Sequence, residues 1–215
     1  MQSKIAVVTA SGKAYYRLVN ELRKENVSFV IAKPGETLPL DVKVAIITEG
    51  GKGVVPLNGH CQKVLLYNET TSPSLIIEEA LLAIRGKDRY ESLVVGVDPG
   101  KNFGIAVLGD GRVLETKSVS SETAAVEVMG IIKRFKSEHT IVKVGNGADD
   151  YRSKLITILD RELPPNAVME SVEEMGTTKN GRVSRRRNFK DASSAVQISI
   201  RRGRKITRNA GGGKV

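Results

Sequence analysis

The sequence predicts an α/β protein made of two units, a small parallel α/β layer followed by a mixed sheet with helices on both faces. In the first part, short and continuously apolar runs rich in Val and Ile alternate with a helical pattern, as in buried parallel strands. In the second part, the tight turns Asp98-Pro99-Gly100 and Asp110-Gly111 separate consecutive strand patterns, as in antiparallel hairpins.

The predicted N-terminal unit covers residues 1–86. Its first strand, residues 4–9, leads through Ser11-Gly12 into a helix that places Ala14, Leu18 and Leu22 on one face. The pattern predicts a second helix that begins at Ser72-Pro73 and ends at Gly86. Between the two helices we expect strands at residues 27–32, 42–48 and 63–67. No motif assigns a role to this unit.

A polar stretch at residues 86–92 is the expected domain boundary, and the second unit covers residues 92–205. Residues 206–215 are expected to form a basic flexible tail. The second unit should contain strands at residues 93–97, 104–108, 113–118, 140–144 and 167–172. Its helices should lie at residues 124–136, 153–163 and 191–202.

The charge of the chain is concentrated near its end. The 215 residues include 34 Lys or Arg and 24 Asp or Glu, a formal net charge of +10. Residues 179–215 contain twelve basic side chains and a single acid, Asp191. Such a segment is typical of a polyanion-binding protein, with nucleic acid as the leading partner. The alternatives are a solvated basic tail or a nonspecific patch that touches ribosomal RNA or an anionic membrane.

Other features of the sequence exclude several classes of protein. No apolar run reaches the roughly 18 residues of a spanning helix, and the N-terminus lacks a secretory signal. We therefore expect a cytoplasmic protein with no membrane partner. The single cysteine, Cys61, cannot form an internal disulfide and excludes a cysteine-rich metal cluster.

Four stretches in the second unit carry a family resemblance. VGVDPGKNFGIAV, residues 95–107, resembles the first strand and hairpin of the RNase H-like superfamily, in particular RuvC-type Holliday-junction resolvases and their YqgF-type relatives. IVKVGNGAD at 141–149, EEMGTT at 173–178 and KDASSAVQISI at 190–200 resemble further motifs of these families in the same order. The resemblance covers roughly residues 93–202 and implies an RNase H-like mixed-sheet domain.

The resemblance implies catalytic carboxylates at Asp98, Glu174 and Asp191, which would hold two Mg²⁺ or Mn²⁺ ions. Such ions prefer oxygen ligands and can support the displacement of a phosphodiester. Glu173 is an alternative to Glu174, because strand alternation points only one of the two toward the site.

Basic side chains would flank these carboxylates and bind the nucleic-acid backbone. The scarcity of aromatic residues favours recognition of backbone and shape in structured or duplex DNA or RNA. The candidate residues are Lys101, Arg185, Arg186, Arg187, Lys190, Arg201 and Arg202.

Three functional hypotheses follow. The first is a metal-dependent nuclease or resolvase-like phosphodiesterase that uses two-metal hydrolysis, with a homodimer as a possible assembly because the resolvases act as symmetric dimers. The second is a non-catalytic nucleic-acid-binding protein with an eroded site, since Gly145-Asn146 and Ser194 stand where the resolvases carry acids. The third is an ATP-binding protein of the actin-like fold, which shares a similar glycine-containing hairpin.

Overall fold

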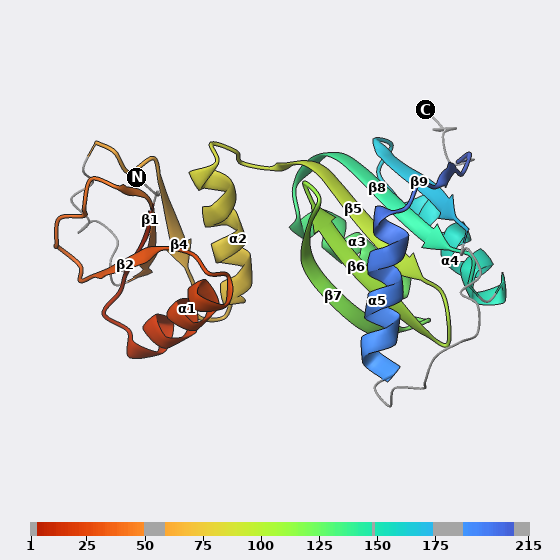
Figure 1. Cartoon of the computed structure of the whole chain (residues 1–215), viewed down its shortest axis with the longest axis horizontal. Helices are drawn as coiled ribbons and strands as arrows, with labels where there is room; N and C mark the ends of the chain where they lie inside the picture. The colour runs from red at the N-terminus through yellow and green to blue at the C-terminus, as the bar shows by residue number, and fades with distance from the viewer. Residues whose placement is uncertain (1–3, 50–58, 148, 174–186, 209–215) are drawn as a thin grey trace. The chain divides into compact units, whose positions relative to one another are not determined.

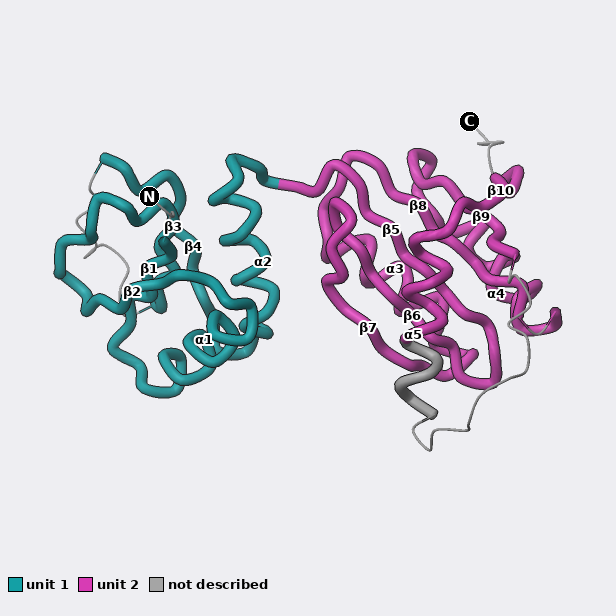
Figure 2. Tube along the Cα trace, in the orientation of Figure 1, with its two compact units in different colours: residues 1–88 teal, residues 89–215 magenta. Residues whose placement is uncertain are grey.

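The computed structural model describes residues 4–49, 59–147, 149–173 and 187–208, with only the backbone for residues 187–192. The chain divides into two compact units, residues 1–88 and 89–215 (Figure 2). Each unit has its own sheet and its own apolar core, so each is described separately.

Four parallel strands form the sheet of the N-terminal unit, in the order β2-β1-β3-β4. They are β1 (Lys4–Val8), β2 (Phe29–Ala32), β3 (Val42–Thr48) and β4 (Lys63–Tyr67). The two interior strands, β1 and β3, are buried along almost their whole length. Burial on both faces explains why these strands read as continuous apolar runs rather than as alternating ones.

Two helices, α1 (Gly12–Lys24) and α2 (Pro73–Ile84), pack against one face of this sheet. Leu18 and Leu22 of α1 recur at helical spacing and enter the same core as Ile5 and Val7 of β1. The opposite face carries a second apolar cluster, to which Leu38 contributes from the segment between β2 and β3.

Six strands form the sheet of the C-terminal unit, in the order β10-β9-β8-β5-β6-β7. They are β5 (Tyr90–Asp98), β6 (Asn102–Gly109), β7 (Arg112–Ser120), β8 (Ser137–Gly145), β9 (Ala167–Val172) and β10 (Arg204–Lys205). β5, β6 and β7 are antiparallel neighbours, whereas β8 and β9 run parallel to β5. The β6–β7 turn has positive φ at Asp110 (49°) and Gly111 (80°), which matches the predicted two-residue hairpin.

Helices cover both faces of the second sheet. α3 (Ala124–Arg134) and α4 (Asp149–Glu162) lie behind it in Figure 1, and α5 (Arg187–Ile200) crosses the near face. α5 approaches β5 so closely that a Cβ built on Gly96 would lie 2.4 Å from the carbonyl oxygen of Ala195. The predicted fold class is therefore confirmed: a parallel α/β layer followed by a mixed six-stranded sheet whose strand order is consistent with an RNase H-like domain.

The sequence predicts a flexible tail from residue 206. In the structure, the chain after α5 forms a further strand, β10, and its contacts with the sheet extend to residue 206. β10 pairs with β9, and the backbone N–H of Ile206 donates to the carbonyl of Met169 at 2.8 Å. A two-residue polar strand has no periodicity, so the sequence pattern does not reveal it.

The described segments contain no helix that is both long enough and apolar enough to cross a membrane.

Candidate functional site

Asp98 lies at the C-terminal end of β5, a central strand of the six-stranded sheet. Side chains alternate between the two faces of a strand, so Asp98 is on the same face as Gly96, the face that α5 covers. Pairing of the parallel strands puts Gly145 of β8 and Val172 of β9 in the same row. The C-terminal ends of three strands therefore meet at one edge beside Asp98.

Two glycines let α5 and a neighbouring loop approach this edge. A Cβ on Gly145 would lie 2.6 Å from Cδ1 of Ile198 in α5. A Cβ on Gly147 would lie 2.1 Å from the carbonyl oxygen of Pro99. The turn after Asp98 is thus packed against the loop that follows β8, and α5 is packed against the end of β8.

Asp191 belongs to α5, one helical turn before Ala195, whose carbonyl covers Gly96. The backbone of the helix that carries Asp191 therefore lies on the Asp98 face of the sheet, and the described structure does not extend to the Asp191 side chain. Glu174 lies outside the described residues. Among the side chains that are described, no group of three His, Cys, Asp or Glu is arranged to hold a metal ion.

Glu173 is engaged elsewhere. Its Oε1 atom lies 3.5 Å from Nη1 of Arg204, and both side chains are mostly exposed, at 63% and 86%. Arg204 is paired in register with Ser171, which lies in the row of Val97 and Val144, on the sheet face opposite to Asp98.

Asn146 belongs to the pair Gly145-Asn146, which stands where the resemblance would place a glutamate. Its Oδ1 atom accepts a hydrogen bond from the hydroxyl of Ser171 at 3.1 Å. The same hydroxyl accepts a hydrogen bond from Nη2 of Arg152, in the first turn of α4, at 2.8 Å. The guanidinium of Arg152 is therefore linked to Asn146 through the hydroxyl of Ser171. No local sequence pattern predicts this arrangement.

The predicted nucleic-acid-binding residues fall into three groups. Lys101 is exposed in the turn between β5 and β6. Arg201 and Arg202 follow α5 and line an open concavity of about 340 Å³ together with Ser171, Glu173 and Arg204. Arg185 and Arg186 lie outside the described residues, and Arg187 and Lys190 are placed only as backbone within α5.

Two other basic residues stabilise the fold. The guanidinium of Arg208 donates to four carbonyl groups near the end of α4, those of Asp160, Leu163, Pro164 and Ala167. Lys143 Nζ donates to the carbonyl of Arg201 at 2.6 Å, just after α5 ends. Both side chains donate to carbonyls at or just after a helix end, where the last carbonyls have no acceptor role within the helix.

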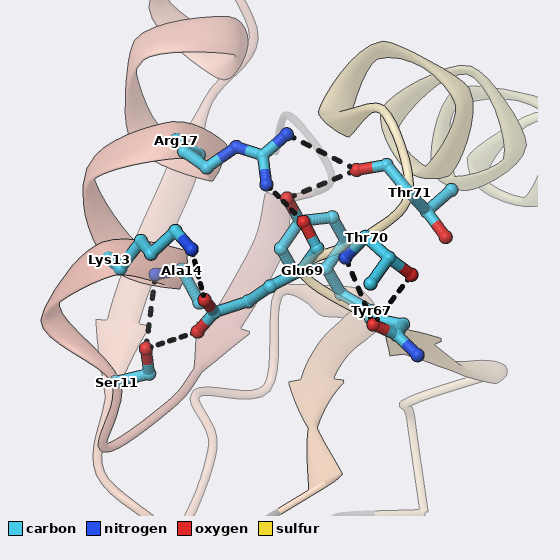
Figure 3. A network of polar contacts seen from close by, with 9 residues as sticks. Ser11, Lys13, Ala14, Arg17, Tyr67, Glu69, Thr70 and Thr71 are labelled. Atoms are coloured by element: carbon cyan, nitrogen blue, oxygen red, sulfur yellow. Dashed lines mark hydrogen bonds and ion pairs between the residues drawn. The ribbon is translucent and has the colours of Figure 1, made fainter.

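The N-terminal unit has a separate polar network at the C-terminal ends of β1 and β4 (Figure 3). The hydroxyl of Ser11 accepts from the backbone N–H of Ala14 and donates to Oε1 of Glu69 at 2.5 Å. Glu69 also pairs with Lys13 at 3.3 Å, and Arg17 donates to the carbonyls of Glu69 and Thr71. The hydrogen bond from Ser11, followed by the nearby cations, holds the pKa of Glu69 below its ordinary value.

A crevice of about 500 Å³ borders this network. Among the described residues, its lining combines hydroxyl, amide and carboxylate groups with the ring of Tyr67 and contains no Lys or Arg. The residues are Ala10, Ser11, Thr48, Glu49, Tyr67, Asn68 and Glu69.

Comparisons with known proteins give one family match and a set of distant structural similarities. Residues 4–83 match the model of a response regulator receiver-like domain, in agreement with the parallel sheet of the N-terminal unit. No curated protein matches the chain.

Among solved structures, the chain is similar to Argonaute from Aquifex aeolicus. The crystal structure of that protein is 12% identical, with a TM-score of 0.29, over 80% of this chain and 34% of the other. A second structure, with externally bound siRNA, is 14% identical, with a TM-score of 0.28, over 80% of this chain and 35% of the other. The chain thus spans about a third of the length of these Argonaute chains, and similarities this distant carry no argument about function.

Proposed function

We propose that the C-terminal unit is a metal-dependent nuclease, a resolvase-like phosphodiesterase that acts on structured DNA or RNA. The observation that supports this most is the position of Asp98 at the end of β5, on the face that α5 covers and in the row formed by Gly145 and Val172. With this geometry, acids from three segments could meet at one edge of the sheet. The segments are β5, the residues after β9, and α5.

The proposed ligands of the metal are Asp98, Glu174 and Asp191. Their carboxylate oxygens are the donors that Mg²⁺ and Mn²⁺ prefer, so the site requires neither histidine nor cysteine. Two bound ions would supply an activated water and stabilise the leaving oxygen of the phosphodiester. Because Glu173 lies beside Arg204, on the sheet face opposite to Asp98, we assign the third ligand to Glu174 rather than to Glu173.

The chain's own residues would bind and orient the substrate. Lys101 is the exposed residue of the turn that follows Asp98, and Arg201 and Arg202 follow α5. Contacts of this kind neutralise phosphates and set the position of the backbone without reading its sequence.

A non-catalytic nucleic-acid-binding protein is the second candidate. It is favoured by the pair Gly145-Asn146, which stands where the resolvases carry an acid, and in which the side-chain oxygen of Asn146 accepts from Ser171. An amide that is already hydrogen-bonded replaces a metal-binding carboxylate poorly, since it carries no negative charge.

The test compares Asp98→Asn with Glu91→Gln. Glu91 lies at the opposite end of the same strand and is exposed, so this control removes one carboxylate charge far from the edge. With labelled branched and hairpin substrates and Mg²⁺ or Mn²⁺, Asp98→Asn should lower the cleavage rate at least about 100-fold, while Glu91→Gln should leave it unchanged.

Chelation of the metal should abolish cleavage without abolishing binding. If the wild type binds these substrates but cleaves none of them with either metal, the second candidate replaces the first. Cleavage that survives Asp98→Asn would overturn the assignment of the site.

A further inference from the structure

The concavity beside β9 is built by a short segment, residues 201–208, that is held at both of its ends. Lys143 donates to the carbonyl of Arg201 at the start of the segment. At its other end, Arg208 donates to carbonyls near the end of α4. Between these anchors, Gly203 packs so tightly that an added Cβ would lie 2.7 Å from Cβ of Glu170.

Three arginines within this segment, Arg201, Arg202 and Arg204, line the concavity. Because the backbone that carries them is held at both ends, this segment need not be ordered on binding, which lowers the entropy that binding must overcome. Arginine presents a planar set of donors that matches the oxygens of a phosphate group. Three cations in one concavity exclude a metal ion and favour a polyanion.

Glu173 is the acidic residue that borders the concavity within the described part of the chain. Its ion pair with Arg204 is exposed, so the surrounding water weakens it and a phosphate can replace it. In the protein without ligand, Glu173 is therefore paired with the guanidinium of Arg204, the group that would bind a phosphate.

The concavity lies at the C-terminal end of β9, two strands away from β5. The spacing between neighbouring strands places β9 about 10 Å from the strand that ends at Asp98. Arg204 is in register with Ser171, so the concavity opens on the sheet face opposite to Asp98, at the same edge of the sheet.

We infer that this concavity binds a backbone phosphate of the nucleic acid whose scissile bond lies beside Asp98, and that Glu173 competes with this phosphate for Arg204. The inference rests on the proposed nucleic-acid function and adds a specific phosphate site to it. It also gives a role to Arg204, which the sequence alone does not single out from the other basic residues.

The test measures binding of a labelled hairpin duplex to the full-length protein in EDTA, where no cleavage occurs. Arg204→Ala should weaken binding roughly three- to tenfold and reduce the slope of log K against log salt by about 1. Lys205→Ala is the matched control, because Lys205 is the exposed neighbour on β10 and does not line the concavity. It should change affinity by less than about twofold.

Glu173→Gln should have the opposite effect on affinity and strengthen binding by roughly two- to fivefold. Glu162→Gln removes the same charge from an exposed site at the end of α4 and should have little effect. In the Arg204→Ala background the gain from Glu173→Gln should disappear, since Glu173 acts through Arg204. A gain that persists there would show a general charge effect and overturn the competition.

The outcomes separate the inference from the proposed function. If the wild type binds the hairpin but Arg204→Ala and Lys205→Ala weaken it equally, the phosphate site is wrong and the proposed function stands. If the wild type binds neither DNA nor RNA hairpins, both are wrong. Thermal unfolding of each variant checks that the fold is retained.

Discussion

The contact between α5 and β5 at Gly96 predicts a large effect from a single added methyl group. A Cβ at this position would lie 2.4 Å from the carbonyl oxygen of Ala195, 2.8 Å from Cβ of Ser199 and 2.9 Å from its backbone nitrogen. Two of these three atoms belong to the helix backbone, so no rotamer change can relieve the clash. α5 as a whole must move away from the strand.

Overpacking of a core typically costs about 1–3 kcal/mol, and a clash with backbone belongs at the upper end of that range. The loss of glycine's flexibility in the unfolded chain offsets about 0.5–1 kcal/mol of this cost. We therefore expect Gly96→Ala to lower the free energy of unfolding by about 2 kcal/mol. For a unit of this size, that corresponds to a fall in Tm of roughly 8 °C.

Gly130→Ala is the matched control. Gly130 lies within α3 and is exposed, and a Cβ added there would meet no atom within 4 Å. Alanine is favoured over glycine in a helix by about 1 kcal/mol, so this variant should raise the Tm. In scanning calorimetry the two substitutions should shift the same transition, that of the C-terminal unit, in opposite directions.

A Gly96→Ala protein that unfolds at the wild-type temperature, while Gly130→Ala is stabilised, would refute the close approach of α5 to β5. The position of the Asp191 backbone on the Asp98 face would then lose its basis. Cleavage by Gly96→Ala at a temperature where it is fully folded gives a second readout, and we expect it to fall because the shift of α5 moves Asp191.

Further predictions concern the ends of the helices. Arg208→Ala should lower the free energy of unfolding by about 2–3 kcal/mol in denaturant titrations, because carbonyls near the end of α4 lose a charged donor, and Arg208→Lys should restore little of it because lysine lacks the planar fork. Ser11→Ala should cost about 1 kcal/mol, since the N-cap of α1 loses its acceptor, and thermal unfolding measures this directly. The pKa of Glu69 is lowered from 4.5, so its contribution to stability is complete above pH 4.5 and is lost as the pH falls through the folded-state value. The stability difference between wild type and Glu69→Gln should accordingly shrink when unfolding is measured below pH 4.5, and a constant difference would contradict the role of the carboxylate.

Local patterns were sufficient to predict most elements of the fold. Continuous apolar runs marked β1 and β3 because these strands are buried on both faces. The Asp110-Gly111 turn marked the β6–β7 hairpin because both residues tolerate positive φ. The strand order and the docking of α5 depend instead on contacts between distant segments, such as Gly96 with Ala195, which no local pattern encodes.

The candidate site was predictable only in part. Asp98 could be placed at a strand end, because Pro99 and Gly100 terminate the strand. The choice between Glu173 and Glu174 stayed open, since a slip of one residue in register exchanges the two faces. The hydrogen bonds that join Arg152, Ser171 and Asn146 connect three separate elements, so they emerge only once the chain is folded.

The short strand β10 has a consequence for solubility. Without it, β9 would be the edge of the six-stranded sheet, and its backbone groups at Glu170 and Ser171 would be open to pairing with another molecule. Natural proteins guard such edges with very short strands that carry positive charge, and Arg204-Lys205 has both properties. A chain truncated after α5 should therefore aggregate through β9, so the residues that we assign to phosphate binding also keep the sheet from growing.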